Sequence, residues 1–320
     1  RHESEPGLVA PDIRVGLTQH QEVMVDKGVM LCTSTDQAIA EPAWESLNGA
    51  RHLPVFDDVL ADHAQAWRHL WRRFDVGLSM TGDGAARDGT TDTMILRLHL
   101  FHLLQVASPH VTDLDVGVPA RGLHGEAYRG HIFWDELFIF PILTLRLPEI
   151  TRTLLMYRYR RLDRARVSAA NAGYRGAMFP WQSGSDGREE SQEIHLNPRS
   201  GEWGPDNSRR QRHVNIAIAY NVWSYVQVTD DMDFLEVFGA EMLLEIARFW
   251  ASAATFDEAR GRWRILGVMG PDEFHDAMPG RSRPGLDDNA YTNVMAAWVI
   301  RRAREALALL PEDRAAELAE

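Results

Sequence analysis

The sequence alternates long helical segments with two long loops, and this alternation constrains the fold more than any other feature. The loops are residues 173–210 and 267–288, and the first contains Trp181 and Trp203 among several glycines. Loops of this length without secondary structure of their own are uncommon in compact domains unless they carry function. We therefore expect a mainly helical domain, a toroid or bundle, with a site built from loops at one end.

Apolar residues recur at helical spacing from about residue 88 onward. In the first such segment Leu96, Leu100 and Leu103 share one face, which is typical of an amphipathic helix. Proline suits the first turn of a helix, because its missing N–H would be unpaired there anyway. Helices are predicted at residues 92–106, 131–147, 213–228, 232–254 and 289–310, with two more beginning at Pro148 and Pro311. A short β segment is expected at residues 255–265.

The first forty residues favour β-structure instead. Residues 13–18, 22–25 and 29–33 are short runs with the composition of strands. Three short strands cannot bury two faces, so residues 1–40 are predicted to be the end of a larger sheet domain. Residues 41–86 are predicted to be a helical linker, in which Trp67 and Trp71 repeat at helical spacing. Residues 87–320 then form the main helical domain.

Composition excludes several classes of function for a chain of 320 residues. The net charge of −12 argues against a nucleic-acid partner and against an anionic membrane surface. The single cysteine, Cys32, excludes an internal disulfide framework and cannot hold a zinc ion alone. The longest apolar run, residues 137–145, contains Pro141 and is too short to cross a bilayer. No signal peptide is visible, so a cytoplasmic location is expected.

The sharpest candidate for chemistry is the Gly-Pro-Asp-Glu stretch at residues 270–273. Two adjacent carboxylates, Asp272 and Glu273, follow a rigid Gly-Pro turn and are flanked by apolar Met269 and Phe274. An anionic neighbour and apolar walls raise the pKa of a carboxyl group, which suits a general acid at neutral pH. Glu273 has the longer reach and is the preferred acid. A structural role remains open for either carboxylate, as a loop cap or as a partner of the nearby arginines. Asp272, His275 and Asp276 could alternatively hold a metal ion.

Two further stretches have the composition of a sugar-binding surface. Trp134 and Asp135 follow a glycine-bounded loop, and Trp181 and Gln182 open a second polar stretch. A tryptophan ring can stack on the apolar face of a sugar, while a carboxylate or amide bonds its hydroxyl groups. Asp135 could equally stabilise the N-terminus of the following helix. Similarly, Asn289 could act only as the cap of the last long helix.

Taken together, these stretches resemble glycoside hydrolase family 65, the inverting α-glucoside phosphorylases and some hydrolases. The matching runs are residues 125–135, 176–183, 213–220, 268–275 and 288–293, in order along nearly the whole chain. The resemblance implies an (α/α)6 barrel that follows a helical linker and a large β-sandwich. Residues 1–40 would then be the last strands of that sandwich, 41–86 the linker, and 87–320 an incomplete barrel.

The resemblance also implies roles for individual residues. Glu273 corresponds to the general acid of the family, and Trp134, Asp135, Trp181 and Gln182 fall where the family holds the non-reducing glucosyl unit. The matching motifs add Asp272, His275 and Asn289 to the substrate-binding set. No metal or organic cofactor is implied. Inorganic phosphate is the co-substrate if the enzyme is a phosphorylase.

The implied reaction is a single displacement with inversion at the anomeric carbon of an α-glucosidic disaccharide. We expect phosphorolysis to β-glucose 1-phosphate. The alternative is hydrolysis, with water as the nucleophile, as in the inverting α-glucoside hydrolases of the same family. In the family, the residues that decide the nucleophile lie C-terminal of position 320, and the only lysine, Lys27, lies far upstream of that region. The chain alone is therefore expected to be inactive.

Two hypotheses from different functional classes remain open. The chain could be a truncated, non-catalytic carbohydrate-binding fragment. It could also be a lyase or another helical-toroid enzyme, which would need a metal ion or a tyrosine or histidine base near Glu273. Members of the family are often dimers, so a homodimer is a further expectation from the resemblance.

Overall fold

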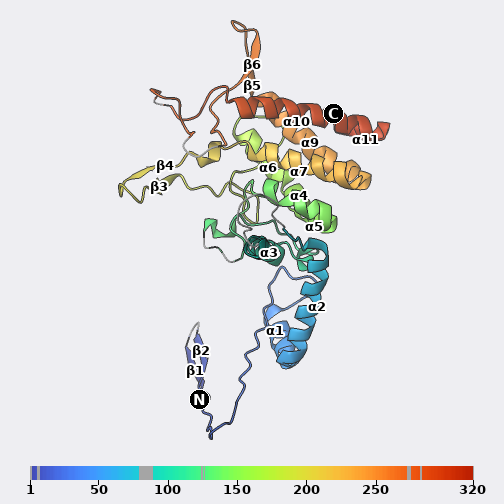
Figure 1. Cartoon of the computed structure of the whole chain (residues 1–320). Helices are drawn as coiled ribbons and strands as arrows, with labels where there is room; N and C mark the ends of the chain where they lie inside the picture. The colour runs from blue at the N-terminus through green and yellow to red at the C-terminus, as the bar shows by residue number, and fades with distance from the viewer. Residues whose placement is uncertain are drawn as a thin grey trace, which may run out of the picture. The chain divides into compact units, whose positions relative to one another are not determined.

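A computed structural model describes residues 2–5, 8–78, 89–123, 125, 127–271, 275–281 and 283–319 of the chain (Figure 1). The chain divides into two compact units, Arg1–Arg72 and Arg73–Glu320. Each unit is described by itself. The boundary lies within the stretch that the sequence predicts to be a helical linker.

The first unit contains little regular structure before its helices. Strands β1 (His2–Glu5) and β2 (Leu8–Pro11) pair as an antiparallel hairpin. Two helices follow, α1 (Pro42–Arg51) and α2 (Phe56–Phe74), which confirms the helical prediction for this stretch. The Glu41 side chain caps α1 by accepting hydrogen bonds from the backbone N–H groups of Ala43 and Trp44.

The prediction of three strands between residues 13 and 33 is wrong. Residues 12–33 adopt neither helix nor strand. Their apolar side chains point into solvent: Ile13 is 62% exposed and Leu31 is 82% exposed. A strand is stabilised by pairing and by burial of one face. Neither occurs here, so the β-branched composition of these runs is insufficient to form strands.

Over its described residues, the second unit is mainly helical, with two small antiparallel hairpins. Its helices are α3 (Gly89–Val106), α4 (Glu136–Arg146), α5 (Pro148–Tyr159), α6 (Leu162–Asn171), α7 (Val214–Thr229), α8 (Met232–Phe234), α9 (Ala240–Ala253), α10 (Ala290–Leu309) and α11 (Glu312–Ala319). The hairpins are formed by β3 (Ile194–Leu196) with β4 (Trp203–Pro205) and by β5 (Ala254–Asp257) with β6 (Arg262–Ile265). The predicted helical segments and the predicted β segment at 255–265 are therefore confirmed, with shifted ends.

Helix α7 forms the centre of this unit. It packs against α4, α5, α9 and α10, and Figure 1 shows α4, α7, α9 and α10 following one another through the unit. Val214, Ala219 and Val222 are completely buried. A helix that buries most of its length on several faces must be surrounded by other elements, and Tyr220 and Val228 are its exposed apolar positions. Because α7 is packed between other helices, the position of its first residue is fixed, and so is that of the residue before it, His213.

The largest shift from the predicted elements occurs before α4. The predicted helix begins at residue 131, whereas α4 begins at Glu136. Ile132 instead forms an isolated antiparallel β-bridge with Ser183. The bridge holds the backbone at Ile132 in an extended conformation, which excludes a helix that begins at residue 131.

No helix in the described ranges combines the length and the apolar character needed to cross a membrane.

Candidate active site

The two predicted sugar-binding stretches lie side by side. Ile132 and Ser183 exchange two backbone hydrogen bonds, each with an N···O distance of 2.9 Å. Beside this bridge, the Gln182 side-chain nitrogen lies 2.7 Å from Nδ1 of His131. Segments about fifty residues apart in the sequence are thus joined by both backbone and side-chain contacts.

An aromatic cluster forms where these stretches meet. The rings of Trp134 and Trp181 are 6.3 Å apart and inclined by 44°. Both contact His213, whose ring centroid lies 4.7 Å from that of Trp134 and 5.1 Å from that of Trp181. Tyr291, in the first turn of α10, lies 6.3 Å from the same histidine. The two predicted tryptophans are therefore neighbours, with the residue preceding α7 between them.

His213 is the most buried ionisable group of this cluster, with 1% of its surface exposed. Burial lowers the pKa of His213 to about 4, and the nearby Met269 backbone offsets this only in part. Neither ring nitrogen makes a hydrogen bond of acceptable geometry with the described residues. The imidazole is therefore neutral at physiological pH, and it packs like an aromatic ring.

Asp135 lies at the first position before α4, but its side chain makes no capping hydrogen bond to that helix. The alternative that the Asp135 charge stabilises the N-terminus of α4 needs no such bond and stays a prediction. The carboxyl group is half-buried, and burial raises its pKa, while Arg121 opposes the shift. An ionised carboxylate can accept several hydrogen bonds, and this one directly follows Trp134 in the sequence.

Glu189 holds the stretch that carries Trp181 and Gln182. Its two carboxylate oxygens accept hydrogen bonds from the backbone N–H groups of Trp181, at 2.9 Å, and Gln182, at 3.1 Å. It also accepts from the Ser191 hydroxyl at 2.7 Å. Sequence reasoning missed this residue. A carboxylate eight residues after a tryptophan is common in solvated loops, so this spacing does not indicate that the carboxylate binds the backbone of Trp181 and Gln182.

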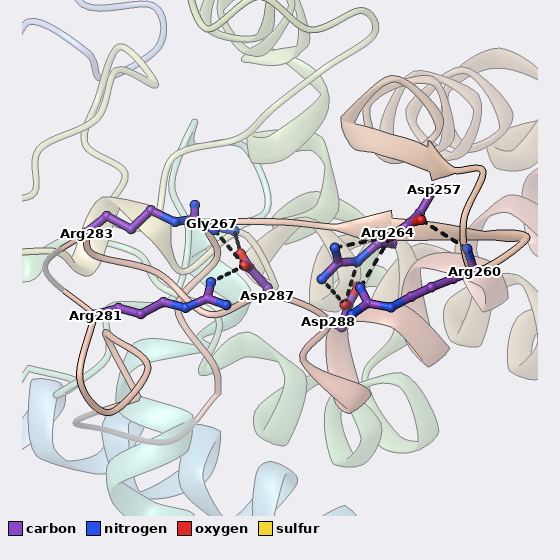
Figure 2. A network of polar contacts seen from close by, with 8 residues as sticks. All are labelled: Asp257, Arg260, Arg264, Gly267, Arg281, Arg283, Asp287 and Asp288. Carbon is purple, nitrogen blue, oxygen red and sulfur yellow. Dashed lines mark hydrogen bonds and ion pairs between the residues drawn. The ribbon is translucent and has the colours of Figure 1, made fainter.

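The loop from Gly267 to Asp288 is held by two groups of ion pairs (Figure 2). Asp287 accepts hydrogen bonds from Arg281 and Arg283, each at 2.6 Å, and from the Gly267 backbone N–H at 3.2 Å. Burial would raise the pKa of Asp287, but its bonds to these arginines hold it below the ordinary value. Both ends of the loop are thus joined through one carboxylate. In the second group, Arg264 on β6 pairs with Asp288.

The two carboxylates of the Gly-Pro-Asp-Glu motif, Asp272 and Glu273, lie outside the described residues. The backbone on either side of them is described. Gly270 N–H donates to the His275 carbonyl at 3.2 Å, and Met269 N–H donates to the Arg210 carbonyl at 2.8 Å. The motif is therefore connected to the segment that precedes His213 and the aromatic cluster.

Asn289 and His275 adjoin the same turn. A side chain placed on Gly270 would lie 3.1 Å from Cβ and Nδ1 of His275 and 3.2 Å from Nδ2 of Asn289. The Asn289 oxygen caps α10 by accepting from the Thr292 backbone N–H at 3.0 Å. The predicted cap is confirmed, and the Asn289 amide nitrogen faces the Gly270 turn. His275 and Asn289 thus both lie against the start of the motif.

The described residues hold no cluster of three or more histidine, cysteine or acidic side chains arranged to bind a metal ion.

Comparison with known proteins gives this arrangement a family. The family model named "Glycosyl hydrolase family 65 central catalytic domain" matches residues 97–320. The chain belongs to glycosyl hydrolase family 65. This confirms the resemblance drawn from the motifs and, with it, the expectation of an enzyme of this family.

Relatives within family 65 match nearly the whole chain. An uncharacterised glycosyl hydrolase of Mycobacterium tuberculosis is 53% identical over 300 residues, which cover 94% of this chain and 22% of that protein. Trehalose 6-phosphate phosphorylase of Lactococcus lactis is 40% identical over 292 residues, covering 91% and 36% respectively. Kojibiose phosphorylase of Caldanaerobacter subterraneus is 36% identical over 306 residues, covering 92% and 36%. The chain thus spans between about a fifth and a third of these relatives' lengths.

A solved structure has a similar fold. A putative kojibiose phosphorylase from the human microbiome superposes with a TM-score of 0.64, covering 87% of this chain and 33% of that one, at 24% identity. The likeness supports a family 65 phosphorylase-like, mainly helical fold. All the described candidate site residues lie within the family 65 match.

Proposed function

We propose that the protein cleaves an α-glucosidic bond with inversion, by phosphorolysis that releases β-glucose 1-phosphate. The observation that carries the proposal is the convergence of Trp134 and Trp181 around His213, with Asp135 and Gln182 directly after them in the sequence. Two tryptophan rings supply apolar surface for a sugar ring, and the adjacent polar groups can bond its hydroxyls. Family membership and phosphorylase relatives support the same reaction.

Each residue has a separate part in the proposed reaction. Trp134, Asp135, Trp181 and Gln182 hold the glucosyl unit. Glu273 donates its proton to the glycosidic oxygen as the bond from that oxygen to the anomeric carbon breaks. A phosphate oxygen forms the new bond to the opposite face of the anomeric carbon, which inverts its configuration. Asp272, His275 and Asn289 complete the site around the acid.

The same proposal includes the architecture around the site. Residues 87–320 form part of an (α/α)6 barrel, residues 41–86 its linker, and residues 1–40 the end of a preceding sheet domain. The family match from residue 97 onward supports the start of the barrel. A cytoplasmic location and a homodimer belong to the proposal as well, and cell fractionation and the native mass of the complete polypeptide test them.

The names of the relatives indicate the substrates to assay. Trehalose 6-phosphate and kojibiose are the first candidates, because phosphorylases named for them are 40% and 36% identical to this chain. The second candidate reaction is hydrolysis, favoured by the 53% identical relative that is named a glycosyl hydrolase. Both reactions use the same acid, and they differ in the nucleophile, which is phosphate in one and a water molecule activated by a second carboxylate in the other.

The deciding assay incubates the complete polypeptide with each disaccharide, with and without inorganic phosphate. Phosphate-dependent formation of β-glucose 1-phosphate is expected. Glucose release at equal rates in both conditions would establish the hydrolase instead. No cleavage of any α-glucoside would contradict both.

The assignment of the acid is tested with Glu273→Gln, which keeps the size of the side chain and removes its proton. The turnover number on an unactivated disaccharide should fall by roughly 10²–10⁴-fold. Glu258→Gln is the matched control, because Glu258 is an exposed glutamate in the β5–β6 turn. Near wild-type turnover in the Glu273 variant would show that another group is the acid.

A further inference from the structure

A buried arginine on α5 holds the backbone around Trp134 and Asp135. Arg158 is 1% exposed, and its Nη2 donates to the Phe133 carbonyl at 2.8 Å. Nε and Nη2 of the same side chain donate to one oxygen of Glu136, at 3.0 and 2.9 Å. One guanidinium therefore contacts the residue before the Trp134-Asp135 dipeptide and the residue after it.

The other half of the site is held by Tyr157, near the end of the same helix, and by Arg161, two residues beyond that end. The Tyr157 hydroxyl donates to the Gly184 carbonyl at 2.6 Å and lies 2.8 Å from the Ser183 hydroxyl. Arg161 donates to the Ser185 carbonyl at 2.6 Å, and its guanidinium carbon lies 3.6 Å from the centre of the Tyr157 ring. Residues 157–161 thus contact both stretches that form the aromatic cluster.

A gain in folding stability does not explain why Arg158 and Glu136 form a buried ion pair. Glu136 is 2% exposed, and burial raises the pKa of its carboxyl group although Arg158 opposes the shift. Within the described part of the chain, Glu136 Oε1 and Arg158 Nη1 make no hydrogen bond of acceptable geometry. Replacing such a buried pair with apolar side chains of similar volume is often neutral or stabilising. What the pair supplies is orientation, because a planar guanidinium fixes two acceptors at once.

We propose that the end of α5 is a shared positioning element of the sugar site, and that Arg158 is the positioning residue for Trp134 and Asp135. The inference rests on the proposed function, because it assumes that these two side chains hold the glucosyl unit. Lysine at position 158 would keep the charge that balances Glu136, but a single ammonium group lacks the fork that reaches both Phe133 and Glu136.

The test compares Arg158→Lys with the double variant Arg158→Met/Glu136→Leu in the complete polypeptide. The measurements are the melting temperature, KM and kcat of disaccharide cleavage, and the Kd for glucose from tryptophan fluorescence. Arg158→Lys should raise KM and the Kd for glucose roughly tenfold or more, with a smaller effect on kcat, because misplaced binding groups weaken ground-state binding. The double variant should recover the melting temperature without recovering glucose binding.

Arg152→Lys is the matched control on the same helix. Arg152 pairs with Asp231 at 3.1 Å and is partly exposed, so this change alters an ion pair of α5 that does not contact the site. Its KM should stay at the wild-type value. Tyr157→Phe gives an independent arm that removes only a hydroxyl group, and it should raise the Kd for glucose through the Ser183–Ser185 segment.

The outcomes separate the inference from the proposed function. Wild-type glucose affinity in the folded double variant would overturn the positioning role and leave the proposed function intact. If the Arg158 variants do not fold, wild-type affinity in Tyr157→Phe overturns the shared role of the helix end. A wild-type protein that neither binds glucose nor cleaves any α-glucoside would instead contradict the proposed function.

Discussion

His213 couples the buried aromatic cluster to pH. Its pKa is about 4 in the folded protein, against an ordinary value near 6.5. Between these values the unfolded chain binds a proton that the folded chain does not, so the free energy of unfolding decreases as the pH falls through this window. His213 should by itself lower that free energy by about 2 kcal/mol between pH 7.5 and pH 5.

Urea denaturation of His213→Phe at the two pH values measures this contribution. Phenylalanine keeps a ring between Trp134 and Trp181 and removes both nitrogens, so the variant should lose about 2 kcal/mol of pH dependence relative to wild type. The control is His110→Phe, because His110 is exposed in the same unit. An unchanged pH dependence in the His213 variant would mean that another group is responsible.

Sequence reasoning identified the residues whose chemistry is local or whose side chain is distinctive. Trp134 and Trp181 were selected as sugar-stacking rings, and the structure brings them together. The Asn289 cap followed from its position before a periodic segment. Sequence reasoning missed Glu189 and Arg158. Glu189 accepts hydrogen bonds from backbone N–H groups within its own loop, and Arg158 donates to a backbone carbonyl that is distant in the sequence. Which carbonyl or N–H such a side chain reaches is decided by packing, and composition does not encode it.

The loop between residues 267 and 288 is held together by hydrogen bonds and ion pairs of its own residues. Asp287 joins its beginning to the two arginines near its end (Figure 2). Asp287→Asn removes the charge that both arginines share, and the cost per lost charged hydrogen bond is about 1.5–3 kcal/mol before relaxation. This loop carries the proposed acid. We therefore expect the substitution to displace the acid more than it weakens sugar binding.

The expected result for Asp287→Asn is a fall in kcat of roughly tenfold or more, with little change in the Kd for glucose. Steady-state kinetics and tryptophan fluorescence measure the two quantities. Asp163→Asn is the control, because Asp163 is an exposed carboxylate on α6 that pairs with Arg166 and not with the loop. A loss of glucose affinity equal to the loss of kcat would refute this division of roles.

At the level of elements, periodicity predicted the helices because their apolar residues recur at helical spacing, whether many of them are buried, as in α7 and α9, or none, as in α1 and α11. The β segment predicted at residues 255–265 is confirmed, and the structure forms it as the hairpin of β5 and β6, whose strands are adjacent in the sequence. Residues 12–33 show where such reasoning fails. Strand composition is local, but a strand needs a partner, and pairing is not visible in a single run of residues.

The contrast between the two units has a consequence for the whole molecule. Residues 12–40 form an extended, largely exposed segment that contains Arg14 and Lys27. Exposed backbone without regular hydrogen bonding is the preferred site of proteolytic cleavage. Brief trypsin treatment of this chain should therefore cut after these two residues before it cuts inside the helices of the second unit.

Mass spectrometry of the early fragments checks this order of cleavage. The variant Arg14→Gln/Lys27→Gln should lose both early fragments and leave later ones unchanged. Early cleavage within α7, α9 or α10 would contradict the assignment of the second unit as the stable body of the chain.

The bridge between Ile132 and Ser183, together with the contacts of the α5 end to both stretches, bears on how such a site can evolve or be redesigned. A sugar-binding surface assembled from independent loops could change one loop at a time. Here substitutions on either side of the bridge should have non-additive effects, because they share supporting residues. Replacing residues 179–190 with those of a relative would therefore require residues 157–161 of the same relative, because the two segments contact each other and must change together.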